Sequence, residues 1–293
     1  MIRGISAGLA AGALWGLVFV APRMAPGFSA VDLTAGRFVA YGLVALAVII
    51  ATRMRQLPTL RQAGAAACMS LLGFTGYYLL LVLAIRDAGT EVPALIIGTI
   101  PLWVMLLGKP GHLRWAALAP GIALTAAGLG LMMSAPAVDG DAANFMRGVA
   151  SALASLVCWT AFALLNSAWL KRHPEVSLTD WANWLGVATG IGAVALWLAA
   201  GSPLSTLAGQ PGFGWFAILC AATGFGSAWL ATILWNMASR RLPASLCGQL
   251  IVSETLFALL YSFAWDGRWP TFAQSAACVL FTLGILASVK AHR

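Results

Sequence analysis

The sequence predicts an all-α membrane protein with ten transmembrane helices, arranged as two inverted repeats of five helices each. Composition is the first reason: of 293 residues, 61% are hydrophobic and only 9% are charged. Soluble domains contain about 45–50% apolar and about 25% charged residues. Because so few polar side chains cannot cover a soluble fold, soluble enzymes, coiled coils, collagen and disordered chains are excluded. Continuous apolar runs such as residues 79–84 favour helices over the alternating strands of a membrane barrel.

The second reason is a series of ten apolar segments, separated by clusters of Gly, Pro, Asp and Asn. A helix that crosses the hydrocarbon core of a bilayer needs roughly 20 mostly apolar residues. The segments are residues 4–21, 34–51, 64–85, 93–107, 113–134, 148–170, 181–200, 213–236, 244–265 and 272–289. The fourth is the shortest, and a longer helix there would begin near Gly89. The first is expected to remain in the mature chain, because no small-x-small cleavage motif follows Val20.

The third reason is the distribution of Lys and Arg between the loops. With the amino terminus in the cytoplasm, twelve of the 17 basic residues fall on the cytoplasmic side and five on the other side. Cytoplasmic loops of membrane proteins carry an excess of Lys and Arg. Both termini are therefore predicted to be cytoplasmic, and an even number of spans agrees with this orientation. No loop is long enough to hold a separate soluble domain.

The two halves of the chain share short patterns. The first segment contains Trp15 and the sixth contains Trp159, each in a run of small and apolar residues. An Ala-x-Arg junction at residues 84–86 precedes Pro101, and a second one at residues 238–240 precedes Glu254 at a similar spacing. Chance similarity between apolar helices is the alternative explanation. We interpret the patterns as a repeat.

The repeat predicts a first five-helix half at residues 1–135 and a second at residues 145–293. Because five is an odd number, the second half must enter the membrane upside down relative to the first. Inverted-topology repeats are typical of secondary transporters, whose substrate site lies near the midplane between the halves.

These motifs together resemble the drug/metabolite transporter (DMT) superfamily, and specifically its ten-helix exporters of the EamA type. The motifs are Leu-Trp-Gly-x-x-Phe at residues 14–19, the two Ala-x-Arg junctions, Pro101, and Ser-Glu at residues 253–254. The resemblance covers about residues 4–290. It implies export of small metabolites through a central cavity between two five-helix bundles, by a multi-pass protein of the bacterial inner (plasma) membrane.

Within this superfamily, the overall character of the chain is similar to that of the aromatic amino-acid exporters of the YddG type. The second half departs from the pattern of the superfamily at two places. Thr160 follows Trp159 where Gly is preferred, and Thr255 follows Glu254 where Pro is frequent. These departures put an exact pseudo-symmetry of the pore in doubt.

The sequence holds no pattern that points to an enzyme. His112, His173 and His292 lie in loops or at the terminus, so an intramembrane zinc site or Ser–His dyad has no histidine. No pair of Asp residues lies within one span, and no nucleotide-binding loop is present. We therefore expect no catalytic residues, no metal and no cofactor. The basic residues come singly or in pairs, so nucleic acid is not an expected partner.

Glu254 is the one acidic residue deep inside a predicted span. A charged side chain inside the bilayer is costly and marks a functional site by default. A protonated Glu254 that bonds a neighbouring helix and serves only packing is the alternative. Arg37, near the start of the second span, is the nearest basic candidate of the same kind, although its side chain is long enough to reach the interface.

The predicted substrate-binding residues are aromatic walls, polar contacts and two special positions. Aromatic rings would stack on an aromatic solute, and side-chain amides would satisfy its polar groups. Packing and interfacial belts are the alternatives for each aromatic residue. The walls are Trp15, Tyr78, Trp103, Trp159 and Trp184, the polar contacts are Asn166, Asn183 and Gln249, and the special positions are Pro101 and Glu254.

The sequence thus predicts a secondary transporter or facilitator that exports small metabolites, amino acids with an aromatic preference, by alternating access. A multidrug or nucleotide-linked solute transporter is the alternative within transport. A non-transporting membrane scaffold is the alternative from another class, and it would need no polar cluster at the midplane. The expected partners are a small-molecule substrate and the lipid bilayer, and a monomeric state is compatible with the sequence.

Overall fold

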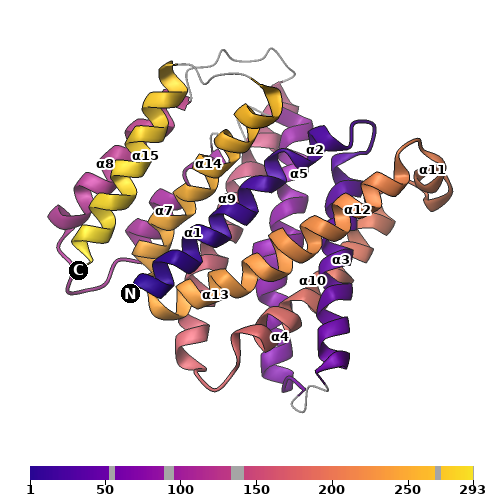
Figure 1. The fold of residues 1–293 in the computed structure, drawn as a ribbon, viewed down its shortest axis with the longest axis horizontal. Coiled ribbons are helices and arrows are strands. Elements are labelled where there is room, and N and C mark those ends of the chain that lie inside the picture. The colour runs from indigo at the N-terminus through magenta and orange to yellow at the C-terminus, as the bar shows by residue number, and fades with distance from the viewer. Residues whose placement is uncertain (53–56, 89–95, 133–141, 268–271, 293) are drawn as a thin grey trace.

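A computed structural model describes residues 1–52, 57–88, 96–132, 142–267 and 272–292 of the chain. Within these ranges the chain forms helices joined by short turns, and none of these residues lies in a β-strand. Figure 1 shows the helices packed side by side in one bundle. The first half contains α1 (Ile2–Gly16), η1 (Leu17–Phe19), α2 (Ala21–Met24), α3 (Ala30–Ala51), α4 (Leu60–Ser70), η2 (Leu71–Thr75), α5 (Gly76–Ala88), α7 (Ile100–Leu107) and α8 (Trp115–Met132).

The second half begins with the longest of these helices. It contains α9 (Ala142–Arg172), α10 (Leu178–Ala200), α11 (Leu204–Gly209), α12 (Phe213–Thr223), η3 (Gly224–Leu230), α13 (Ala231–Arg241), α14 (Ala244–Asp266) and α15 (Phe272–Ala291). Over the described residues, each of the ten apolar segments found in the sequence overlaps one of these helices or several consecutive ones. The suggested start near Gly89 and the junction between the halves at 136–141 lie outside the described residues.

Six helical stretches among the described residues are long and apolar enough to cross a membrane: Ala30–Ala51, Leu60–Ala84, Ala143–Arg172, Leu178–Ala200, Phe213–Arg241 and Ala244–Trp265. Three shorter apolar helices accompany them: Ile96–Leu107, Trp115–Leu131 and Ser275–Ala291. The chain is therefore an all-helical membrane protein. Figure 1 shows α1 beginning and α15 ending at the same end of the bundle. The count of ten crossings and the cytoplasmic side of the termini stay predictions.

Helix contacts link the two halves in a symmetrical pattern. Helix α3 packs on α10, α7 on α14, and α8 on α15. Further contacts include two matched pairs: α5 packs on α9 as α13 packs on α1, and α4 packs on α10 as α12 packs on α3. Exchanging every helix for its counterpart in the other half reproduces this set of contacts. Two halves related by an approximate two-fold axis would pack in this way, while the boundaries 1–135 and 145–293 stay a prediction.

The third span of each half contains a π-helical segment. In the first half, an 11-residue α4 leads into η2, and in the second an 11-residue α12 leads into η3. Glycines in both segments allow close packing: a Cβ on Gly73 would lie 2.5 Å from the Phe162 ring, and one on Gly224 would lie 2.6 Å from Cβ of Ala40. π-Helical segments inside α-helices are frequent at functional sites. Each π-helical segment interrupts its span at a place where the span packs against the other half.

The second span of each half begins with the same N-terminal cap. The Ser29 hydroxyl accepts a hydrogen bond from the Asp32 backbone N–H at 3.0 Å, and Ser177 accepts one from Asp180 at 3.0 Å. Such a cap satisfies one of the free N–H groups at the start of a helix. The Asp32 carboxylate also accepts hydrogen bonds from the backbone and hydroxyl of Ser202, at 2.8 and 2.7 Å. These bonds tie the start of α3 to the turn after α10.

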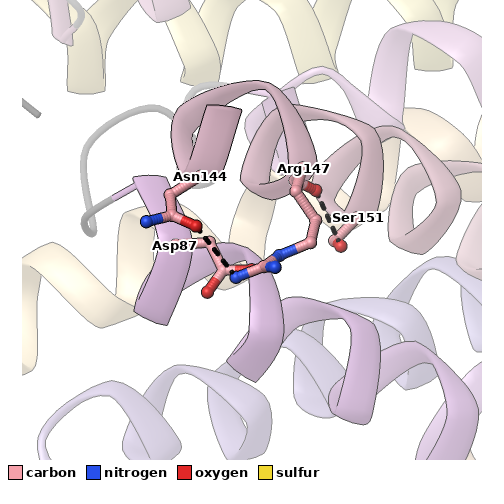
Figure 2. Close-up of polar contacts among 4 residues, drawn as sticks. All are labelled: Asp87, Asn144, Arg147 and Ser151. Carbon is pink, nitrogen blue, oxygen red and sulfur yellow. Dashed lines mark hydrogen bonds and ion pairs between the residues drawn. The ribbon is translucent and has the colours of Figure 1, made fainter. Parts of the chain in front are cut away.

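Charged side chains fix the ends of the third spans to α9. At the end of α5, the Arg147 Nε donates to the Asp87 carboxylate at 2.6 Å, and its Nη2 donates to Asn144 at 3.1 Å (Figure 2). The Ser151 hydroxyl in turn donates to the carbonyl of Arg147 at 2.9 Å (Figure 2). At the other end of α9, the Lys171 ammonium donates to the Leu242 carbonyl at 2.7 Å, just after α13. Helix α9 is thereby bound to the third span of each half, one at each of its ends.

Candidate functional site

Three tryptophans from both halves meet inside the bundle, and we name them the tryptophan cluster. Trp15 lies on α1, Trp159 on α9 and Trp235 on α13. The ring centroids are 6.3 Å apart for Trp15–Trp159, 5.3 Å for Trp15–Trp235 and 6.2 Å for Trp159–Trp235. These separations lie in the favourable range for aromatic pairs. Trp235 is buried, whereas Trp15 and Trp159 are only partly buried, so these two rings have surface left for a solute.

Further aromatic contacts extend from this cluster to α5. The Trp159 ring lies 6.1 Å from Phe162, which lies 5.5 Å from Phe74. Phe74 lies 5.9 Å from Phe38, and Phe38 lies 6.4 Å from Tyr78. The contacts of Phe162 and Phe38 within this series are edge-on. The result is a continuous series of packed rings from the tryptophan cluster to Tyr78, which we name the aromatic row. Its middle rings, Phe38, Phe74 and Phe162, are buried.

Four polar side chains on three helices lie together at the Tyr78 end of the aromatic row, and we name them the polar group: Arg37 of α3, Tyr77 and Tyr78 of α5, and Glu254 of α14. All four are partly buried. Arg37 lies within electrostatic reach of Glu254 and of both tyrosines. The guanidinium carbon of Arg37 lies 4.5 Å from the centre of the Phe38 ring. The Tyr78 hydroxyl donates a long hydrogen bond, 3.4 Å, to the Ala30 carbonyl.

The two opposite charges of the polar group are not paired with each other. Among the described residues, no ion pair within 4.0 Å joins Arg37 to Glu254, and no hydrogen bond joins Glu254 to another side chain. The buried Nε of Arg37 also has no hydrogen-bond partner. A role of Glu254 in helix packing alone would require a bonded neighbour. In the described part of the chain, neither charged side chain has a bonded partner.

Two contacts place the polar group beside the tryptophan cluster. The Ser155 hydroxyl donates to the Tyr77 carbonyl at 3.0 Å, so α5 touches α9 one turn away from Trp159. On the other side, Gly12 of α1 faces Ser253 and the backbone nitrogen of Glu254, which a Cβ on Gly12 would approach to 3.1 Å. Trp15 lies within one turn of Gly12 on the same helix. Aromatic rings and charged groups therefore border the same region of the bundle.

Asn166 and Asn183 belong to a second, buried polar network between α9, α10 and α13. The side-chain oxygen of Asn166 accepts from the Trp181 indole N–H at 2.7 Å, and its amide donates to Asn236 at 3.0 Å. The Asn183 oxygen accepts from the Trp229 indole N–H at 2.7 Å. The amide nitrogen of Asn183 is buried without a partner. Asn166 is thus bound at both ends, while Asn183 retains a free donor.

The other predicted residues lie apart from the tryptophan cluster. Gln249 is fully buried and bonds Thr125 at 2.9 Å and Ser288 at 3.0 Å, which ties α14 to α8 and α15. Trp103 is 45% exposed, and its indole donates to Thr99 of its own helix at 3.2 Å. Trp184 is buried against Trp181, with ring centroids 6.2 Å apart. Pro101 is buried in the first turn of α7.

A groove of about 440 Å³ lies between η1, α2, α12, η3 and α14. Its lining includes Leu17, Leu219, Tyr261 and Trp265. Leu17 is 43% exposed and Trp265 52% exposed, so the groove opens on the surface of the bundle. Its lining is almost wholly apolar, and it therefore lacks the charged contacts that the polar group offers.

Comparison with known proteins decides the family. Residues 2–134 match the EamA-like transporter family. Over 308 aligned residues, the chain is 32% identical to the inner membrane protein YtfF of Escherichia coli (strain K12), and the alignment covers 99% of this chain and 96% of that protein. The chain belongs to the EamA-like transporter family. A solved protein structure with 22% sequence identity and a TM-score of 0.76 covers 98% of both chains and supports the fold.

Membership in the EamA-like family makes the chain a membrane transporter of the DMT type, as the motifs at Trp15 and Glu254 predicted. Sequence reasoning missed one member of the tryptophan cluster, Trp235. It lies one residue from the predicted end of the eighth span, where a tryptophan is ordinarily interfacial. The available signal was the position of Trp235 and Asn236 a few residues before the basic pair at 240–241. The same pattern is typical of a tryptophan at the membrane interface, so it did not identify Trp235 as a member of the cluster.

Proposed function

We propose that this protein exports small metabolites, amino acids with a preference for aromatic side chains, across the bacterial inner membrane. It acts as a secondary transporter or facilitator by alternating access, with the substrate held between the two halves. The observation that carries this proposal is the tryptophan cluster, which combines Trp15 of the first half with Trp159 of the second beside the charged polar group. The inner-membrane name of the relative YtfF supports the location.

The chemistry of the site suits an aromatic, charged solute. A substrate ring that packs on the partly exposed rings of Trp15 and Trp159 would gain about 0.5–1.5 kcal/mol per ring pair beyond area burial. The charged ends of the substrate need polar partners inside the bilayer, because unpaired charges there are costly. An exporter must also release its substrate, so we expect weak binding.

The arrangement also suits alternating access. Trp15 belongs to the first half, and Trp159 and Trp235 belong to the second. Rigid-body rocking of the halves would therefore separate these rings and open the site toward one side of the membrane. A membrane scaffold would need no charged group at this depth, and the half-buried Arg37 and Glu254 count against that alternative.

Purified protein in liposomes tests the proposal. We expect exchange of labelled phenylalanine and tryptophan across the liposome membrane, with slower exchange of alanine. Trp159→Ala and Tyr78→Ala should each lower phenylalanine flux at least several-fold more than alanine flux. Trp115→Ala is the matched control, because Trp115 is the first residue of α8, is 55% exposed and is not a predicted substrate-binding residue, and it should change neither flux.

Two outcomes would contradict this proposal. Flux of nucleosides or cationic drugs without flux of amino acids would favour the multidrug or nucleotide-linked alternative. Equal losses for phenylalanine and alanine in Trp159→Ala, Tyr78→Ala and Trp115→Ala would make the aromatic residues packing residues.

A further inference from the structure

We propose that Arg37 and Glu254 bind the two charged ends of a zwitterionic α-amino acid, with the substrate carboxylate on Arg37 and its ammonium group on Glu254. This inference rests on the proposed function and names how the same site selects its substrate. It adds a requirement for both charges on one small molecule, which aromatic walls alone do not impose.

Arg37 lies in the N-terminal half of α3, and Glu254 lies near the middle of α14, so each comes from a different half of the chain. Both lie within helices that are long and apolar enough to cross the membrane. Charged residues inside spans are rare and face a polar partner, the bundle interior or water. Each half therefore contributes one charge to the same interior region.

Among the described residues, neither charged side chain is paired within the protein. Arg37 and Glu254 lie within electrostatic reach of each other, but no ion pair within 4.0 Å joins them. The Nε of Arg37 is buried without a hydrogen-bond partner. The charged atoms of the two side chains therefore lie more than 4.0 Å apart. A bridging molecule there would satisfy both charges at once.

The chemistry of the two side chains suits the two charged groups of an amino acid. A guanidinium binds a carboxylate through two parallel N–H bonds, a geometry that an ammonium group cannot offer. A carboxylate such as that of Glu254 accepts from an ammonium group. An α-amino acid carries both charges on one carbon atom, so it fits between opposed charges. The side chain of the amino acid then extends toward Tyr78 and the aromatic row. The contact between Gly12 and Glu254 brings this region close to Trp15.

The inference predicts how substrate analogues behave. 3-Phenylpropionate keeps the ring and the carboxylate but lacks the ammonium group, and 2-phenylethylamine keeps the ring and the ammonium group but lacks the carboxylate. Each analogue leaves one buried charge of the site unpaired. Sites built for a polar group reject analogues that lack it, by factors of about tenfold or more. We expect both analogues to compete at least about tenfold more weakly than phenylalanine.

The test measures competition against labelled phenylalanine in liposomes that contain the full-length protein. In Arg37→Gln, inhibition by 3-phenylpropionate should weaken further while inhibition by 2-phenylethylamine is unchanged. In Glu254→Gln, the reverse selectivity is expected. Where a variant no longer transports, quenching of the intrinsic tryptophan fluorescence by each compound replaces the flux. Arg37→Lys keeps the charge without the planar fork, and it should retain part of the carboxylate preference.

Two results would overturn the inference. In the first, both analogues compete with the wild-type protein as well as phenylalanine does. In the second, Arg37→Gln and Glu254→Gln weaken all three compounds by the same factor. Either result leaves the proposed function standing if phenylalanine flux persists. Absence of amino-acid flux from the wild-type protein, with flux of another solute class, removes the proposed function and this inference with it.

Discussion

Two of the several kinds of polar side chain inside this bundle differ in whether their atoms are bound. Gln249 and Asn166 are fully buried and bonded to neighbouring helices. Arg37 and Glu254 are partly buried and not joined to each other. Side chains of the first kind stabilise helix contacts, because hydrogen bonds between helices in a membrane contribute about 0.6 to 2 kcal/mol each. Side chains of the second kind have no such bond among the described residues, and we propose that they bind the solute.

Gln249→Leu tests this distinction, because the sequence placed Gln249 at the substrate. Loss of its hydrogen bonds to Thr125 and Ser288 should lower the free energy of unfolding by about 1–3 kcal/mol. The ratio of phenylalanine to alanine flux should not change. Unfolding in detergent measures the first quantity and liposome exchange the second. Ser288→Ala removes one of the bonds and should cause a smaller loss, and a shifted flux ratio in Gln249→Leu would return this residue to the substrate site.

At the scale of the element, helix α1 carries a row of glycines on one face. Gly4, Gly8, Gly12 and Gly16 are spaced four residues apart, and all four are buried. A Cβ on Gly8 would lie 2.7 Å from the Leu250 side chain, and one on Gly16 would lie 2.8 Å from the Ala258 backbone nitrogen. Small residues allow such close approach of helices in membranes. The row therefore holds α1 against α14 and positions Trp15.

Gly12→Ala should push α1 away from α14, because the added Cβ would overlap the Ser253 hydroxyl and approach the Glu254 backbone. Overpacking of this kind typically destabilises by about 1–3 kcal/mol. We also expect lower phenylalanine flux, since Trp15 and Glu254 lie on the two helices that separate. Thermal unfolding in detergent and liposome exchange measure the two effects.

Gly130→Ala on α8 is the matched control, since a Cβ at Gly130 would meet nothing within 4 Å. This substitution should leave flux unchanged and raise helix stability by up to about 1 kcal/mol. Equal stability of Gly12→Ala and Gly130→Ala would show that the α1–α14 contact tolerates a side chain.

At the scale of the whole molecule, orientation in the membrane follows from the distribution of basic residues. A reporter fused after residue 293 and one inserted at 173–175 should both read cytoplasmic, because the basic loops lie on that side. A reporter inserted at 210–212, between α11 and α12, should read the opposite side. Alkaline phosphatase and green fluorescent protein fusions report the two sides. An external position for residue 293 or for 173–175 would overturn the count of ten spans.

Much of this molecule follows from local properties of the chain. Membrane class and helix positions depend on the number of consecutive apolar residues, which is a property of each segment by itself. The family follows from motifs around Trp15, Pro101 and Glu254, and the comparisons confirm it. Glu254 was recognisable because a carboxylate deep in an apolar run is conspicuous in any structure.

Only the tertiary structure decided which side chains meet. Trp15 and Trp103 are both tryptophans within predicted spans, yet Trp15 contacts two other tryptophans and Trp103 is 45% exposed. Apolar residues surround both, and lipid and protein interior are almost equally apolar, so hydrophobicity cannot tell an inner helix face from an outer one. Gln249 and Glu254 lie on one helix, and contacts from α8 and α15 bind Gln249 while Glu254 remains unbound. Those contacts join residues more than 30 positions apart, and no local pattern records them.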